Sequence, residues 1–312
     1  MRDFLRRLTV VASILGVLLA LLVVACNLII NKKASFKIPA ADTLVLFGHF
    51  HSEFAYNDTL IPGFKNLGSG GEAYFYTFRK MENVLAQNPQ IRTVFIEFSN
   101  NQVTRRMNDW IWADSYMEAE YPIYAPFIPL QDHRYLFTHN FRGYINSSSF
   151  ALKQQMISIL ANDYAYSKLI GRYFYTTANK VDSLIAVQHT MADTVNYALT
   201  SPDNIRYLKA CIDLCRAHGK KVWLVRTPTH QDFPVLKNEQ LFQEIRNKHF
   251  GDVPFLDFSA FPIRNTELAD LEHLNCYGAS RFSAWVDKML KGGLLSQPAQ
   301  ETKNFIHANM PM

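Results

Sequence analysis

The sequence is poor in cysteine and has no long run of basic residues, and both absences exclude classes of protein. Four cysteines in 312 residues do not make a disulfide framework, and no cysteine–histidine spacing suggests zinc. Cys211 and Cys215 are four apart on an expected helix, which favours two small buried residues over a disulfide. The formal charge of +5 is not concentrated in the body of the chain, so we expect no nucleic acid partner.

The sequence also lacks internal repeats and low-complexity tracts. Apolar residues make up 48% of the chain and aromatic residues 13%, which is ample for a core and excludes global disorder. The length beyond the first forty or so residues fits one large α/β domain, or one domain with an insertion.

One long uncharged segment lies near the N-terminus. Residues 8–30 consist mainly of Leu, Val, Ala and Ile, and as a helix they would extend about 34 Å, enough to cross a bilayer. The arginines within residues 1–7 favour a cytoplasmic N-terminus, which places the main domain on the extracytoplasmic, periplasmic side of the membrane. An alternative is cleavage before Cys26 and a lipid anchor there. The apolar run continues past Cys26, which favours a retained signal anchor.

Apolar runs alternate with helical patterns over the rest of the chain. We predict strands over residues 43–47, 93–98, 221–225 and 255–258, and helices over residues 72–86, 201–218, 239–248 and 279–291. A strand, a helix and a strand within about 55 residues form a βαβ unit, so the sheet is expected to be parallel. The predicted domain covers residues 43–292 after a tether over 31–42, with a helical insertion at about 140–198 and a loose tail over 293–312.

Polar residues follow directly on three of the predicted strands. They read Gly-His-Phe-His-Ser over 48–52, Ser-Asn-Asn over 99–101 and Arg-Thr-Pro-Thr-His over 226–230. Sites in open parallel sheets form outside the carboxyl ends of the strands. Asp270 and His273, three apart before the last predicted helix, can place an imidazole and its orienting carboxylate at that edge. A serine nucleophile requires such a pair as its general base.

With these residues the chain resembles the SGNH/GDSL hydrolase superfamily over residues 43–290, and its membrane-anchored extracytoplasmic, envelope-modifying members most of all. The Asp-x-x-His block is intact. The asparagine block matches at Asn100 but has Phe98 in place of the family's glycine, and Gly70, in a loosely matching block, is the candidate for the oxyanion-hole glycine. The resemblance implies a three-layer α/β/α, flavodoxin-like domain with a parallel sheet and a helical insertion, preceded by one transmembrane helix.

The block that carries the nucleophile in this family departs from the pattern. Gly48 fits, but His49 stands where aspartate is expected and Phe50 where the serine is expected. Phenylalanine cannot attack a carbonyl group. Ser52 lies two residues later, which along a helical turn rotates a side chain by about 200°, so only a rearranged turn would bring it to His273.

Two functions remain open at this point. The first is an ester hydrolase or acyltransferase that acts on cell-envelope carbohydrate or lipid. In that esterase, Ser52 attacks, His273 takes the proton, Asp270 orients His273, and Gly70 and Asn100 hold the oxyanion. Acyl transfer needs only these groups, so no cofactor is expected.

The second function is that of a pseudoenzyme, a catalytically inactive SGNH-fold protein that binds an envelope polymer or a partner protein. Phe50 is the residue that favours it. A third and weaker hypothesis uses His49, His51 and His273 as metal ligands. The sequence places no carboxylate beside them, so we predict no metal site. The acyl group, the acceptor and the oligomeric state are left open.

Overall fold

The computed structural model describes residues 1–188 and 196–311, and the chain divides into two compact units. One unit joins Met1–Ser35 to Trp112–Tyr166, and the other joins Phe36–Ile111 to Ser167–Met312. The second unit contains the sheet and every residue predicted for the site.

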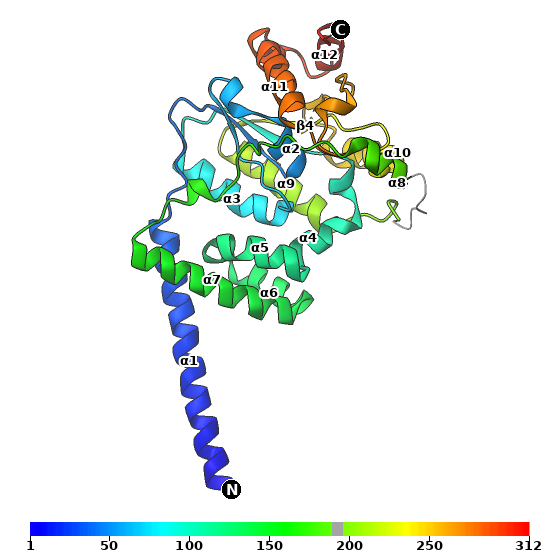
Figure 1. The fold of residues 1–312 in the computed structure, drawn as a ribbon. Coiled ribbons are helices and arrows are strands. Elements are labelled where there is room, and N and C mark those ends of the chain that lie inside the picture. The colour runs from blue at the N-terminus through cyan, green and yellow to red at the C-terminus, as the bar shows by residue number, and fades with distance from the viewer. Residues whose placement is uncertain (189–195, 312) are drawn as a thin grey trace. The chain divides into compact units, whose positions relative to one another are not determined.

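A five-stranded parallel sheet forms the centre of this second unit (Figure 1). Its strands, in the spatial order β2-β1-β3-β4-β5, are β1 (Leu44–Phe47), β2 (Phe64–Asn66), β3 (Thr93–Glu97), β4 (Lys221–Arg226) and β5 (Phe255–Asp257). Every pair of neighbours is parallel, which confirms the α/β class and the parallel sheet. Strand order reverses between β1 and β3, and this is where parallel sheets open a crevice at their carboxyl ends.

Buried strands explain the apolar runs from which the sheet was predicted. All five residues of β3 are buried, and Val45, Leu46 and Phe47 of β1 are fully buried. Strands covered on both faces have near-continuous apolar sequences rather than alternating ones. β2 was not predicted, because its three residues follow a Pro-Gly pair and include a lysine.

The helices of this unit have clear local causes. They are α2 (Phe50–Ala55), α3 (Tyr74–Gln87), α8 (Val181–Gln188), α9 (Pro202–Ala217), α10 (Glu239–Phe250), α11 (Cys276–Lys291) and α12 (Thr302–Ala308). Ser201 caps α9, with proline in its first turn. Asn275 caps α11 by accepting two backbone N–H groups. Helices α3 and α9 lie side by side, with the rings of Phe75 and Tyr207 5.1 Å apart (Figure 1).

The chain beyond Gly293, predicted to be loose, forms α12 in the structure. Ile306 of this helix is buried in the main core. The indole nitrogen of Trp285 donates a hydrogen bond to the carbonyl of Asn309 at 2.7 Å. Leu294 is buried in the same core, and Leu295, Phe305 and Met310 pack against it. The local sequence does not show these contacts.

The first unit consists of helices. It contains α1 (Arg2–Lys33), α5 (Asp114–Tyr124), α6 (Leu130–His139) and α7 (Phe141–Ala161), while the short α4 (Asp109–Trp112) lies at the boundary of the two units. α1 is long and apolar enough to cross a membrane, by length and composition. Its C-terminal part is held within the unit, because Gln155 donates to Asn27 at 2.8 Å and Asn31 donates to the carbonyl of Pro126 at 2.7 Å.

The region of the predicted insertion is only partly helical. α7 covers its first part, and the chain from 169 to 180 has no regular element before α8 begins. Residues 189–195 of the predicted insertion lie outside the described residues. The aromatic stretch after Trp110, for which the sequence showed no periodicity, forms α5 and α6, with Pro122 inside α5.

Candidate functional site

A carboxylate at the end of β3 fixes the turn that follows β1. Glu97 Oε2 accepts the backbone N–H groups of His49 at 3.1 Å and Ser52 at 2.9 Å, at the start of α2. These N–H groups have no partner within a helix, and a negative charge at this end is favourable. A Cβ at Gly48 would lie 2.4 Å from Ser52 Oγ and 2.5 Å from Glu97 Cβ, so the turn requires glycine.

Two histidines of this turn face the other oxygen of Glu97. His49 Nε2 lies 3.3 Å and His51 Nδ1 3.4 Å from Glu97 Oε1, and all three side chains are buried. Burial lowers the pKa of His49 to about 4, so its imidazole is neutral at pH 7. Burial alone would raise the pKa of Glu97, but the two histidines and the hydrogen bond from the backbone N–H of Ser52 lower it below its usual value.

His51 also faces a second carboxylate. Its Nε2 atom lies 3.6 Å from Glu272 Oε2. Burial alone would lower the pKa of His51, but Glu272, Glu97 and Asp270 raise it. The environment of His51 therefore has a negative potential that attracts cations.

Asp270 orients His273 as a catalytic dyad requires. His273 Nδ1 lies 2.9 and 3.0 Å from the two carboxylate oxygens of Asp270. The same carboxylate accepts the backbone N–H groups of Glu272 and His273, which closes the turn. Burial alone would raise the pKa of Asp270, but the hydrogen bond from His273 lowers it. His273 Nε2, the atom that a base would use, is buried and has no hydrogen-bond partner.

Phe50 contacts both His273 and the candidate oxyanion glycine. Its ring centroid lies 5.5 Å from that of His273, and a Cβ at Gly70 would lie 2.1 Å from Phe50 Cε1. A Cβ at Gly70 would also lie 2.8 Å from Glu53 Oε2, so the carboxylate of Glu53 lies beside this glycine. Phe50 therefore occupies the region in which a serine at this position would meet its base.

The side chains of Ser52 and Asn100 are engaged elsewhere. Ser52 is fully buried, and its hydroxyl donates to the carbonyl of His49 at 2.9 Å. Asn100 donates to Asn238 at 3.1 Å and to Glu239 at 2.7 Å. The structure thus brings His49, Phe50, Asp270 and His273 into one cluster, and it directs the hydrogen bonds of Ser52 and Asn100 away from His273.

Two acidic residues of this cluster were missed in the sequence. Glu97 is a lone charge in a buried apolar strand, which is a signal for a functional or structural partner. Glu272 lies inside the Asp-x-x-His block and faces His51, a contact that depends on the fold.

Aromatic side chains border the cluster on the side of α2. The Phe54 ring lies 4.7 Å from that of His273 at an interplanar angle of 35°, and the Phe174 ring lies 4.9 Å from that of Phe54. A hydrogen bond from the backbone N–H of Phe174 to the carbonyl of Glu53 holds the neighbouring segment in place. Phe174 is 43% exposed, so aromatic surface is available to a ligand beside Phe54 and His273.

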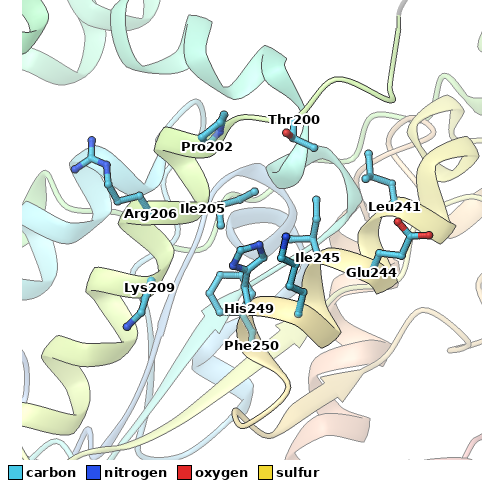
Figure 2. A pocket seen from close by; sticks show the side chains of 11 residues that line it. Thr200, Pro202, Ile205, Arg206, Lys209, Leu241, Glu244, Ile245, His249 and Phe250 are labelled. Atoms are coloured by element: carbon cyan, nitrogen blue, oxygen red, sulfur yellow. The ribbon is translucent and has the colours of Figure 1, made fainter.

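A separate pocket of about 550 Å³ lies between α9 and α10 (Figure 2). Arg206 and Lys209 of α9 and Glu244 and His249 of α10 are among its lining residues. None of its lining residues belongs to the histidine cluster. We find no arrangement of nucleophile and base in it.

The class defined by fold and site is an α/β protein with a parallel sheet and a carboxylate-oriented histidine beside the carboxyl ends of its strands. No family model matches the chain, and no curated protein matches it. Among solved structures, it is similar to a Bacteroides fragilis protein described as a "putative acylhydrolase". That similarity has 12% sequence identity and a TM-score of 0.37, and covers 84% of this chain and 93% of the other. Function must therefore be inferred from the geometry of the site.

Proposed function

We propose that this chain is a membrane-anchored protein with an SGNH-like, three-layer α/β/α domain that binds envelope carbohydrate or lipid without hydrolysing it. The observation that supports the proposal is the position of Phe50, whose ring packs against His273 and Gly70 where a nucleophilic serine would stand. The apolar helix α1 anchors the domain, which faces the extracytoplasmic, periplasmic side.

Serine catalysis requires a hydroxyl within about 2.6–3.2 Å of its base. The Ser52 hydroxyl donates instead to the carbonyl of His49, from a fully buried position. To reach His273, Ser52 would have to leave this hydrogen bond and turn past Phe50. The Asp270–His273 pair has the geometry of a base, but the structure offers it no nucleophile among the residues of α2.

The oxyanion site is compromised as well. The carboxylate of Glu53 lies beside Gly70, and a carboxylate opposes the negative charge that develops on the carbonyl oxygen during acyl transfer. The Asn100 amide is used by Asn238 and Glu239. Of the two groups that would stabilise the transition state, Gly70 thus faces a carboxylate and Asn100 is committed to structural hydrogen bonds.

Binding is supported by the aromatic surface beside His273. Ligand sites are lined mainly by apolar and aromatic side chains with a few polar groups among them. Phe54 and Phe174 supply such surface next to the polar cluster. We therefore assign this surface to an acylated envelope carbohydrate or lipid, with a protein of the envelope as the alternative partner.

A fluorophosphonate probe tests the loss of serine chemistry. Full-length protein in detergent micelles is treated with the probe and mapped by peptide mass spectrometry, with circular dichroism to verify folding. We expect no label on Ser52. A label on Ser52 that disappears in His273→Ala would overturn the proposal and establish the alternative, an active hydrolase or acyltransferase in which Ser52 attacks.

Co-sedimentation with isolated envelope polysaccharide tests the binding function. We expect Phe174→Ala to weaken binding several-fold. Phe141→Ala is a matched control, because Phe141 is also exposed but belongs to the other unit. Equal binding by the two variants would contradict the assignment of the aromatic surface.

A further inference from the structure

We propose that His51, Glu272 and His273 bind a divalent transition metal ion, with zinc as the representative ion. This role does not depend on serine chemistry. The resemblance to the SGNH/GDSL superfamily does not imply it.

The three side chains lie close enough to one another to bind one metal ion. One ligand atom from each lies within 4.8 Å of the other two, and His51 Nε2 is 3.6 Å from Glu272 Oε2. Bonds of about 2.1 Å in a tetrahedral site place ligand atoms about 3.4 Å apart. The Glu272 side chain is 42% exposed, so it can close the remaining distance by a change of rotamer.

The two imidazoles each present an unsatisfied nitrogen. His51 Nε2 and His273 Nε2 are buried and form no hydrogen bond. Buried polar atoms nearly always have a partner, so two such atoms beside one carboxylate call for a specific explanation. A single cation would satisfy both nitrogens and the Glu272 carboxylate together.

In each imidazole the other ring nitrogen, Nδ1, faces a carboxylate, as in metal-binding histidines. Metal-binding histidines usually give their other ring nitrogen to a carboxylate, which fixes the tautomer. His273 Nδ1 has Asp270 at 2.9 Å, and His51 Nδ1 has Glu97 at 3.4 Å. Both rings therefore keep Nε2 free and directed to the same place.

The carboxylates of the cluster carry negative charge, which favours the binding of a cation. Glu97, Asp270 and Glu272 are three carboxylates that face His51 or His273, and Glu97 is wholly buried. Within the described residues, none of the three forms an ion pair with a lysine or an arginine. A buried carboxylate such as Glu97 is costly without a compensating positive charge nearby.

A second group, formed by His49, His51 and Glu97, also has one ligand atom from each residue within 4.8 Å of the other two. The atoms of this group already make other interactions. Glu97 Oε2 holds the backbone of α2, and His49 and Glu97 are wholly buried. Glu97 therefore acts as the supporting carboxylate of His51. Two histidines and one glutamate are a ligand set of catalytic zinc sites and leave a fourth position open.

Zinc titration of the full-length protein, purified in detergent without a polyhistidine tag, tests the proposal. After treatment with a chelator, the protein is titrated with zinc chloride against a competing chelator dye, and cobalt chloride serves as a spectroscopic probe. We expect one ion per chain and the visible absorption of tetrahedral cobalt. His273→Ala and Glu272→Gln should each weaken zinc binding by at least about 100-fold, and Asp270→Asn by about 10- to 100-fold.

His249→Ala and Glu244→Gln are matched controls, because both residues are exposed on α10 and lie outside the cluster. They should bind zinc as the wild type does. His273 and Glu272 are partly exposed, so their variants should fold, which circular dichroism verifies. Failure of the wild type to bind zinc, or equal binding by the cluster variants and the controls, would overturn the proposal.

Discussion

The ring of Phe50 packs against the imidazole of His273 with a centroid separation of 5.5 Å and an interplanar angle of 71°. This contact joins the position at which the SGNH resemblance predicts a nucleophile to a histidine that is oriented by a carboxylate. An aromatic ring in that place excludes both water and an acyl substrate from one side of His273. The consequence can be tested by restoring the hydroxyl group.

Phe50→Ser should give slow fluorophosphonate labelling at position 50, because Asp270 still orients His273. The Glu53 carboxylate at Gly70 keeps the rate low. Labelling is measured by peptide mass spectrometry in the presence of a chelator, so that no metal ion occupies His273 Nε2. The double variant Phe50→Ser/His273→Ala is the control and should be unlabelled. Labelling that survives in this control would mean that His273 is not the base.

Gly70→Ala should destabilise the protein by about 1–3 kcal/mol, because the new Cβ would overlap Phe50 Cε1. Chemical denaturation of the detergent-solubilised protein measures the free energy of unfolding. In a Phe50→Ala background the cost of Gly70→Ala should fall below about 0.5 kcal/mol, since the overlapping ring is gone. An equal cost in both backgrounds would place the ring of Phe50 away from Gly70.

Lys80→Met should cost about 3–5 kcal/mol of unfolding free energy, because it breaks a buried ion pair and leaves Glu72 charged in the interior. Lys80 Nζ lies 2.8 Å from Glu72 and donates to the carbonyls of Leu67 and Ile170. Lys291→Met, which removes an exposed pair with Asp287, should cost less than about 1 kcal/mol. Similar losses in the two variants would show that the Lys80 pair contributes little.

Asp257→Asn should destabilise the protein at pH 7 by about 1.5–3 kcal/mol, through lost charge-assisted hydrogen bonds to Arg226. Burial alone would raise the pKa of Asp257, but Arg226 lowers it. A carboxyl group with a lowered pKa in the folded state stabilises above its unfolded pKa, about 3.9, and this stabilisation is lost as pH falls through the lower folded pKa. The difference between variant and wild type should therefore shrink below about pH 4.

Unfolding followed at several pH values measures this difference. Asp252→Asn is the control, because Asp252 pairs with Arg216 at the exposed surface. Its effect should be below about 1 kcal/mol at pH 7. A wild-type advantage over Asp257→Asn that persists unchanged at the lowest pH would contradict the ion-pair origin of the effect.

The strands of the sheet were predictable where burial on both faces produced continuous apolar runs, as in β1 and β3. β2 was not, because its short sequence owes its conformation to pairing with β1. The same reasoning explains α12, whose position depends on contacts with Trp285 and the core. Tertiary contacts determine the conformation of such short segments, so local propensity does not predict it.

For the site, spacing predicted that Asp270 could orient His273, and the two side chains are hydrogen bonded. The roles predicted for Ser52, Gly70 and Asn100 stay predictions. The hydrogen bonds of Ser52 and Asn100 go elsewhere, and the carboxylate of Glu53 lies beside Gly70. The acidic partners of His51 could not be inferred, because Glu97 and Glu272 come from segments 175 residues apart that only the fold brings together. Which way a side chain turns at a strand end depends on those partners.

The turn after β1 is held by groups that do not include the side chain of residue 50. Glu97 accepts two of its N–H groups, and Asn66 donates to the carbonyls of Ser52 and Tyr56 while accepting the N–H of Gly68. The atoms that hold the backbone of the turn are thus separate from the side chain at position 50. A chain built in this way can exchange one reactive group for another, or for none, and still fold around the same scaffold.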